Sequence, residues 1–579
     1  MHDDDTQPRD ATDERMSRRK WLGVAAATTV AAGASGFQKA AIAQVAPTTM
    51  PSADSTLLGS RVYNVRDFGA KGDGVTLDTQ AVQAAIDAAN RDRGGVVVVP
   101  AGDFVIGTVE LKSNVTLHLS AAGKLLGSPR HEDFSRGKGV PPGNGNVVML
   151  YAAEAENVTI EGRGTVDGNG ATFYTGYGDG TGPRTPGAPP STSPRNVERP
   201  HLFVFHKCSN LVLRDAFFTR SAYHCCRILK CDHVRIDGIR IYNRVNKNND
   251  GFHFNDSTYV HIANCTVQCQ DDACALFGSN KFVTVTNCSF STRWSVFRFG
   301  GGECENVTVS NCVIYDTYGC PIKLACGNRA RFENMLFSNL IMKNVTGPIT
   351  IGLDSRSRRS STQPATEPAR KGIVRNIVFN NIRATVVKEP VNHPDIPFDV
   401  KPYLGETRTC ITVNGVSGDD VIENVSFTDV HVTYPGGGTK EEADLRDVPQ
   451  FAGEYFQIGP RPAYGFYARN VRGLTLSNVR FDTETPDLRP AVAFDHVTDA
   501  SVNGLSATGN TEAESLLRVI DSKDVLLSET RVLTPVATFL QVEGEKNESI
   551  VVDGGSVSKA SKVLTLARGA SEKSVTLRV

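Results

Sequence analysis

The sequence lacks an excess of charge of either sign. Its 579 residues include 62 Lys and Arg residues and 63 Asp and Glu residues. This balance excludes a global electrostatic attraction to nucleic acid or to an anionic membrane surface, so any charged ligand must be bound by a local cluster. The sequence also lacks a change of composition after about residue 61, which argues against several unlike domains and predicts one elongated domain over residues 61–579.

Long apolar runs are also scarce. The apolar stretch 21–34 is short, and no later segment is long and apolar enough to cross a bilayer. Arg18 and Arg19 precede this stretch, and the small-residue pattern Ala-Ile-Ala at 41–43 follows it. These features are typical of a twin-arginine export signal that ends in a cleavage site, whereas a single transmembrane anchor is the alternative that the short stretch disfavours.

The sequence therefore predicts an N-terminal extension and signal peptide over residues 1–43, with Met16 as a possible true start, and a linker over 44–60. We expect a protein exported to the periplasm or the extracellular space, with no membrane contact after cleavage and in monomeric form.

The number of cysteines is odd, so they cannot all be paired within the chain. There are thirteen, and twelve of them lie between Cys208 and Cys326. An odd number does not fit a complete disulfide framework, and a twin-arginine substrate folds in a reducing cytoplasm before export. Buried, stacked thiols are therefore expected in place of many disulfides.

The chain does contain a short phrase of alternating apolar and polar residues that returns many times. Four steps between its clearest copies, which start at residues 210, 233, 259, 282 and 306, are 23, 26, 23 and 24 residues. The copies are NVTIEG at 157, NLVLRD at 210, HVRIDG at 233, YVHIAN at 259, FVTVTN at 282 and NVTVSN at 306, with looser copies at 376, 424, 473, 524 and 549. Alternation with period two predicts a strand with one buried face.

A repeat this short cannot bury its own apolar face, so it must stack on its neighbours. Strands that repeat with no helical pattern between them predict an all-β fold, the right-handed parallel β-helix. Asn264, Asn287 and Asn311 share one position of successive coils, followed each time by a cysteine, which predicts stacked side chains at a turn. A β-sandwich or propeller is the competing fold, but it predicts hairpin turns and longer periods.

Three segments depart from the repeat. Residues 78–92 have apolar residues at helical spacing, with Asp78 as the expected N-cap, and predict a short helix that closes the first coil. The Gly/Pro-rich segment 177–196 and the basic segment 355–372 predict protruding loops, either as walls of a cleft or as solvated linkers.

Three aspartates lie among apolar residues in NNDGFHF (248–254) and QDDACALFG (270–278). If coils repeat every 21–26 residues, Asp250 lies one coil from Asp271 and Asp272, at about 4.8 Å strand spacing plus a lateral offset. Crowded carboxylates raise one another's pKa, so that one holds a proton while its neighbour stays ionised, as glycoside hydrolysis requires. The alternative is that each aspartate only caps a turn.

Cationic and aromatic residues follow on the next coils. We expect Arg293, Arg298, Trp294, Lys323 and His253 to bind substrate. A guanidinium can hold a carboxylate in a bidentate pair, and a Trp can stack on a sugar ring. The alternatives are salt bridges from the arginines to the aspartates, a Trp packed on the flank of the solenoid, and turn histidines at 224 and 253.

These segments resemble glycoside hydrolase family 28, the polygalacturonase-like enzymes of pectin-active parallel β-helix fold. NNDGFHF resembles the family's Asn-x-Asp-Gly motif, QDDACALFG its Asp-Asp motif and PIK (321–323) the end of its Arg-Ile-Lys motif. The segment 63–89 resembles the family's opening segment, and the likeness covers residues 61 to about 350.

The resemblance implies Asp271 as general acid, Asp250 and Asp272 as the groups that orient and deprotonate water in an inverting mechanism, and Lys323 as a binder of a substrate carboxylate. Two departures stand out. Trp294 occupies the place of the histidine of the family's Gly-His-Gly segment, and Pro321 replaces the arginine of Arg-Ile-Lys. The first leaves the protonation of the acid to other neighbours, and the second weakens the case for a galacturonate at the usual subsite.

The prediction is a glycosidase that hydrolyses an acidic polysaccharide of plant cell-wall or microbial type, with no metal or other cofactor. A pectin-like, galacturonate-containing polysaccharide is the leading substrate. One rival is a polysaccharide lyase on the same fold, in which the aspartates hold calcium and Arg298 or Lys323 takes the proton. The other rival is a carbohydrate-binding solenoid without catalysis.

Overall fold

The computed structural model describes residues 58–141, 147–173, 198–246, 248–327, 329–353, 372–391, 405–418, 421–450, 452 and 455–579. The chain divides into two units, 1–54 and 55–579, and every described residue belongs to the second. The predicted export signal, nearly all of the linker and both predicted loops lie outside the described residues, apart from Gly372.

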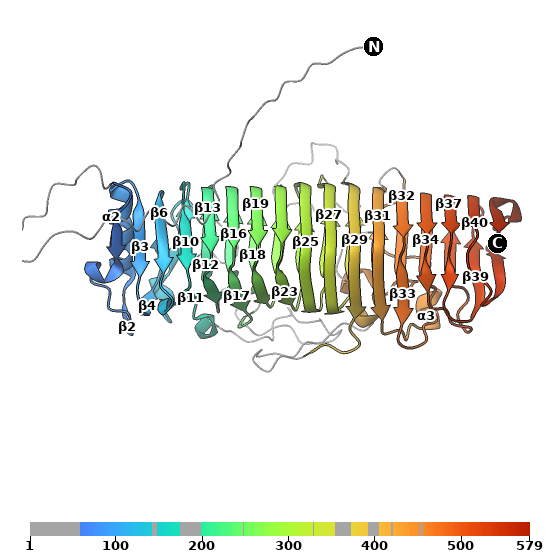
Figure 1. The fold of residues 1–579 in the computed structure, drawn as a ribbon, viewed down its shortest axis with the longest axis horizontal. Coiled ribbons are helices and arrows are strands. Elements are labelled where there is room, and N and C mark those ends of the chain that lie inside the picture. Colours follow the sequence, from blue (N-terminus) through green and yellow to red (C-terminus); the bar gives the residue numbers. More distant parts are fainter. Residues whose placement is uncertain are drawn as a thin grey trace, which may run out of the picture. The chain divides into compact units, whose positions relative to one another are not determined.

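The strands wind into a right-handed parallel β-helix, which confirms the predicted fold class (Figure 1). Through the central coils the chain repeats three strands per coil, as in β15 (Cys226–Leu229), β16 (Asp232–Asp237) and β17 (Arg240–Asn243). Each strand pairs in parallel with its counterpart one coil later, and among the described strands only β8 (Ser135–Arg136) with β9 (Val147–Ala153) pairs antiparallel.

The repeated phrase forms one face of this stack. It supplies β16, β19 (Thr258–Ala263), β22 (Lys281–Thr286) and the first part of β25 (Glu303–Thr317). Val234, Val260, Val283 and Val307 are register partners on these strands, and all are buried. The alternation of the phrase thus places every second side chain in the core, as a strand with one buried face requires.

Interior side chains stack coil upon coil into one continuous core. The rings of Phe337, Phe379 and Phe427 stack with centroids 5.1 and 4.7 Å apart. Burial of this apolar surface is the main free-energy gain of a fold in which no coil has a core of its own.

The asparagine column is confirmed. Asn264, Asn287, Asn311, Asn339 and Asn381 all adopt a left-handed backbone with φ of 50–57°, a conformation that asparagine tolerates better than most residues. The side-chain amide of Asn339 donates to Oδ1 of Asn311 at 3.0 Å, and that of Asn381 donates to Oδ1 of Asn339 at 2.9 Å.

The thiol prediction is also confirmed. All thirteen cysteines are free, and all except Cys320 are buried. The backbone N–H of Cys265 points to Sγ of Cys288 at 3.4 Å, so the cysteines that follow the asparagines stack in the interior.

The predicted N-terminal helix is α2 (Thr79–Arg91), which packs against β1 (Val62–Asn64) and β3 (Gly95–Val99) at the end of the stack (Figure 1). Asp78 occupies the predicted N-cap position, but its side chain makes no hydrogen bond to the helix. Its carboxylate accepts the backbone N–H groups of Lys71 and Gly72 at 2.7 and 2.9 Å, so it fixes the preceding loop. In the described part of the chain, no helix has the length and apolar character of a membrane span.

One face of the solenoid carries the candidate site, and we call it the site face. Its strands are β9, β12 (His201–His206), β15, β18 (Phe252–Asn255), β21 (Cys274–Phe277), β24 (Phe297–Gly300), β26 (Ile322–Cys326), β28 (Ile349–Leu353), β30 (Ile411–Asn414), the first parts of β32 (Phe466–Ser477) and β34 (Val492–Asn503), β36 (Leu517–Ile520), β39 (Val536–Glu543) and β41 (Ala560–Ala567).

Candidate active site

The three aspartates lie at the turns that lead into strands of the site face. The carbonyl of Asp250 accepts the N–H of Cys225 at 3.1 Å, and the carbonyl of Asp272 accepts the N–H of Gly251 at 2.9 Å. Asp250 and Asp272 therefore occupy equivalent positions on adjacent coils, about 4.8 Å apart along the axis. Asp271 precedes Asp272 by one residue, and the charges of Asp250 and Asp272 both act on its carboxyl group, so the three aspartates lie on neighbouring coils and influence one another.

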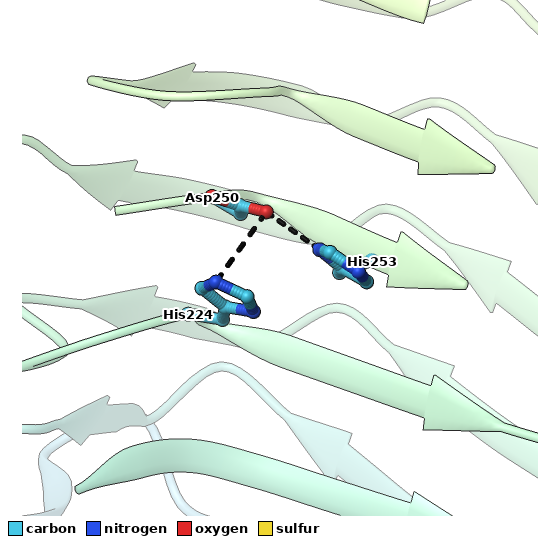
Figure 2. A group of neighbouring side chains, drawn as sticks. All are labelled: His224, Asp250 and His253. Atoms are coloured by element: carbon cyan, nitrogen blue, oxygen red, sulfur yellow. Dashed lines mark hydrogen bonds and ion pairs between the residues drawn. The ribbon is translucent and has the colours of Figure 1, made fainter. Parts of the chain in front are cut away.

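Asp250 is almost fully buried and is held by two histidines (Figure 2). Its Oδ2 lies 2.6 Å from Nδ1 of His253 and 3.8 Å from Nε2 of His224. Burial lowers the pKa of His253 to about 3 and lowers the pKa of His224 well below its usual value. Both rings are therefore neutral near neutral pH, and the predicted site residue His253 contacts a carboxylate of the site.

Burial and neighbouring negative charges both raise the pKa of two of the aspartates. Burial, and then the charges of Asp250 and Asp272, raise the pKa of Asp271 well above its usual value. Burial and the charge of Asp272 do the same for the pKa of Asp250. The side-chain amide of Asn248 donates to Oδ2 of Asp271 at 3.3 Å. Interacting acids of this kind titrate as a group, so the cluster retains a proton at pH values where an isolated aspartate has lost it.

Asp272 pairs with the predicted arginine. Nη1 of Arg298 donates to Oδ2 of Asp272 at 3.2 Å, and the guanidinium lies 5.2 Å from the centroid of the Phe277 ring. The second oxygen, Oδ1, is buried and has no hydrogen-bond partner among the described residues. A buried carboxylate oxygen without a protein donor is costly unless water or a ligand satisfies it.

Lys323, on the coil after Arg298, lies close to Trp294. Lys323 is the register partner of Arg298 on the next coil, and its Nζ lies 5.8 Å from the centroid of the Trp294 ring. The guanidinium of Arg293 lies 5.7 Å from the same ring, and Nη1 of Arg293 donates to the carbonyl of Tyr318. Pro321, which stands where the family motif has arginine, offers only its carbonyl, to the N–H groups of Val296 and Phe297.

Sequence reasoning missed Arg227. It is the register partner of His253 on β15, so outward positions on five successive coils carry Arg227, His253, Ala275, Arg298 and Lys323. A signal existed, because Arg227 precedes His253 by 26 residues, the same step that separates the repeated phrases starting at 233 and 259.

Arg199 was missed as well. Its guanidinium lies 4.4 Å from the ring centroid of Tyr223 and donates to Oδ1 of Asn248 at 3.1 Å. Arg199 comes directly after a long insertion in the repeat, of which residues 174–197 lie outside the described part of the chain. The repeat therefore offered no position for it.

His224, Asp250 and His253 have ligand atoms within 4.8 Å of one another. Two imidazoles and a carboxylate are ligands that a divalent transition metal accepts. The hydrolytic chemistry of paired carboxyl groups needs no such ion, because a proton donor and a base suffice.

Comparisons with known proteins agree with this geometry. A model of the glycosyl hydrolases family 28 matches residues 94–394, a range that contains all the predicted site residues and differs at both ends from the expected 61–350. The polygalacturonase of Persea americana is 27% identical over 354 residues, 59% of this chain and 70% of that protein, and polygalacturonase-2 of Solanum lycopersicum is 24% identical over 395 residues, 65% and 80% of the two chains.

Among solved structures, the hyperthermoactive exopolygalacturonase of Thermotoga maritima matches with a TM-score of 0.54 and 19% identity, over 73% of this chain and 92% of that one. That likeness shows the fold. The family match covers more than half of the chain, and it supports a hydrolase over the rival lyase and over a solenoid without catalysis. This protein is a glycosidase, and it belongs to glycoside hydrolase family 28.

Proposed function

We propose that this protein hydrolyses the glycosidic bonds of a galacturonate-containing, pectin-like polysaccharide with inversion at the anomeric carbon. The observation that carries the proposal is the placement of three aspartates, from two adjacent coils, between cationic side chains on either side along one face. Arg227 lies on the N-terminal side of Asp250, and Arg298 and Lys323 lie on the C-terminal side of Asp272. A polyanion meets cations on both sides of the reacting bond.

Asp271 is the proposed general acid. Its raised pKa keeps the proton that must pass to the glycosidic oxygen as the bond from that oxygen to the anomeric carbon breaks. Asp250 and Asp272 orient a water molecule on the opposite face of the sugar and take its proton as the water oxygen bonds to the anomeric carbon. The unpartnered Oδ1 of Asp272 is a suitable acceptor for that water.

Substrate carboxylates are assigned to Lys323 and to the guanidinium groups. Arg298 stands one coil before Lys323 and replaces the cation that Pro321 cannot supply. Arg227 offers a second guanidinium on the other side of the acids, and Arg293 holds Trp294 in place as a surface for a sugar ring.

Digestion of polygalacturonate, followed by product analysis, tests the proposal. The variant Asp271→Asn is expected to lose at least about a hundredfold in kcat, the scale for removal of a general acid. Asp256→Asn is the matched control, because Asp256 is an exposed acid at the far end of β18 whose Oδ1 accepts the N–H of Ser279 at 2.8 Å. An amide oxygen retains that bond.

Nuclear magnetic resonance of the first product anomer tests the stereochemistry. Inversion is expected, and retention would contradict the roles given to Asp250 and Asp272. Unsaturated products that absorb in the ultraviolet and vanish with a chelator would favour the lyase.

The proposal includes export and a monomeric enzyme. The proposed export rests on Arg18 and Arg19 and on the apolar stretch that follows them. In cells that express the chain with Arg18→Lys and Arg19→Lys, the protein should remain in the cytoplasmic fraction, whereas the wild type should be exported from the cytoplasm. Fractionation of the cells measures the difference. Sedimentation measures the oligomeric state.

A further inference from the structure

The outward positions of the site face form one ladder that continues far beyond the acids. After Lys323 the register partners are Thr350, Thr412, Tyr467, Ala493 and Arg518, on β28, β30, β32, β34 and β36. An uninterrupted face of this length would let a long polysaccharide lie across many coils. In the described part of the chain, other segments lie over the site face at both ends of this ladder.

On the C-terminal side a segment lies across the site face. We call residues 439–450, together with Ala452, the strap. Its carbonyl groups are bound by outward side chains of three strands: Arg518 of β36 donates to the carbonyl of Ala443 at 2.6 Å, Arg469 of β32 donates to that of Val448, and Asn414 of β30 donates to that of Pro449 at 2.8 Å. The strap thus runs along the solenoid axis towards the acids.

The strap ends one coil from Lys323. A Cβ added to Gly352 of β28 would lie 2.9 Å from the Cα of Ala452, so the backbone of the strap rests directly on that strand. Gly352 is on the strand that pairs with β26, which carries Lys323. The face is therefore covered immediately after the last cationic position of the site.

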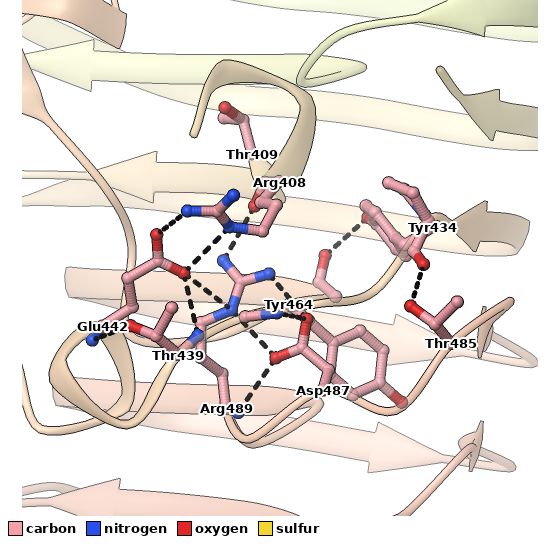
Figure 3. A network of polar contacts seen from close by, with 12 residues as sticks. Arg408, Thr409, Tyr434, Thr439, Glu442, Tyr464, Thr485, Asp487 and Arg489 are labelled. Atoms are coloured by element: carbon pink, nitrogen blue, oxygen red, sulfur yellow. Dashed lines mark hydrogen bonds and ion pairs between the residues drawn. The ribbon is translucent and has the colours of Figure 1, made fainter. Parts of the chain in front are cut away.

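The strap is anchored as a built part of the fold. It begins with α3 (Lys440–Ala443), whose N-cap Thr439 and Glu442 form a reciprocal capping box. Glu442 then accepts from Arg408 at 2.5 and 3.2 Å and lies 3.8 Å from Arg489, which itself pairs with Asp487 (Figure 3).

A second anchor lies further along the strap. Arg446 pairs with both carboxylate oxygens of Glu543 on β39, at 2.7 and 2.8 Å, and Glu543 is completely buried. Val448 of the strap is also buried. A bidentate pair with a buried carboxylate fixes geometry more firmly than an exposed ion pair does.

The N-terminal side is covered as well. Strand β8 pairs antiparallel with β9, and Val140 packs on a separate apolar cluster outside the core. The carbonyl of Gly139 lies 2.8 Å from Nδ1 of His206 on β12. The cluster consists of Val148, Tyr151, Val204 and Leu229, from β9, β12 and β15.

The outward positions between these two covers run from Arg227 to Lys323. Among them the side chain of Arg298 is 27% exposed, whereas Lys323 is buried. The strands concerned are β15, β18, β21, β24 and β26. Four strand spacings of about 4.8 Å amount to roughly 19 Å, the length of on the order of four sugar units. The acids lie inside this short interval, with only the positions of Arg298 and Lys323 between Asp272 and the strap.

We propose that this glycosidase acts at chain ends. One end of the polysaccharide abuts the strap, so cleavage releases a product of fixed length, one or two sugar units. The strap is the element that sets this length. The inference rests on the proposed function, because it assumes that the aspartates hydrolyse a polysaccharide lying along the site face.

The test follows products of polygalacturonate and of oligogalacturonides over time. From the first minutes, the wild type is expected to release one short product while the viscosity of the polymer falls slowly. A mixture of intermediate lengths at early times, with a rapid fall in viscosity, overturns the inference but leaves the proposed function intact. Absence of hydrolysis overturns the proposed function, and the inference with it.

Oligogalacturonides that carry a bulky fluorophore on one end or the other give a second measurement. A closed site must reject one of the two labelled ends, with a loss of about a hundredfold in rate for that substrate, as expected for a misplaced reacting bond. Equal cleavage of both labelled substrates would show an open site and overturn the inference.

Displacement of the strap gives the converse result. The double variant Arg446→Ala/Val448→Asp breaks the ion pair with Glu543 and places a charge at a buried position of the strap, and proteolysis at Lys440 reports its release. Once the strap is released, the amount of intermediate-length products should rise several-fold. Arg472→Ala, which removes an exposed pair with Glu423 at 3.2 Å, is the control and should leave the products unchanged. Short products from a released strap contradict the assignment.

Discussion

A carboxyl group that keeps its proton inside a protein weakens the fold at neutral pH. The raised pKa of Asp271 means that the folded chain binds a proton that the unfolded chain releases above about pH 4. The free energy of unfolding therefore decreases as the pH rises through that range. The proposed acid is a site where function and stability conflict.

The variant Asp271→Asn should therefore be more stable than the wild type at pH 7. We expect a gain of about 1 kcal/mol in the free energy of unfolding, the usual size for a stabilising single substitution. The gain should disappear below pH 4, where Asp271 is protonated in both states. Thermal unfolding at pH 3.5 and pH 7 measures the difference, and a gain of the same size at both pH values would rule out the proton as its cause.

Arg298 should control the pH profile. Its positive charge lowers the pKa of Asp271 and of Asp250, in opposition to burial. In Arg298→Gln the proposed acid should keep its proton to higher pH, so the alkaline limb of the kcat/KM profile moves to higher pH while kcat/KM itself falls. Arg240→Gln is the matched control, because Arg240 lies over the ring of Phe217 at 3.9 Å and contacts no acid of the site. An alkaline limb that stays in place would contradict the coupling.

At the scale of the strand and turn, the sequence predicts most of what the structure contains. The period of the phrase defines the coils, and the asparagines at 264, 287 and 311 mark their turns. A period that varies from 23 to 26 residues does not fix register to one residue. The ladder pairs Asp250 with Asp272 and not with Asp271, and this is established by the backbone hydrogen bonds alone.

Other features depend on contacts between distant segments. The strap is bound by Asn414, Arg469 and Arg518, and no local pattern joins these residues to 443–449. The role of Asp78 was missed for a related reason. The capping pattern describes only the helix on the C-terminal side of the cap, whereas the loop that Asp78 binds lies on its N-terminal side.

The asparagine column offers a test of the turn. Asn339→Ala should lower the free energy of unfolding by about 2 kcal/mol, because alanine disfavours the left-handed backbone and loses the two amide hydrogen bonds. Asn339→Gly keeps the backbone freedom and loses only the bonds, so it should cost roughly half as much. Urea unfolding measures both, and equal losses would show that the backbone conformation contributes nothing.

At the scale of the whole molecule, the free cysteines distinguish this fold from a disulfide scaffold. Titration of thiols in denaturant should give thirteen, whereas the native protein should expose about one, because only Cys320 is partly accessible. The melting temperature should not change on addition of a reductant. Fewer than thirteen thiols after denaturation would contradict the absence of disulfides.

The helix α2 has a consequence for solubility. A parallel stack of coils would otherwise end in a row of backbone groups ready to pair with the next molecule. Because α2 packs on β1 and β3, that terminus presents a helix surface to any incoming strand. The helix α2 thus prevents strand pairing between molecules at this terminus. A chain that lacks α2 would be free to polymerise head to tail.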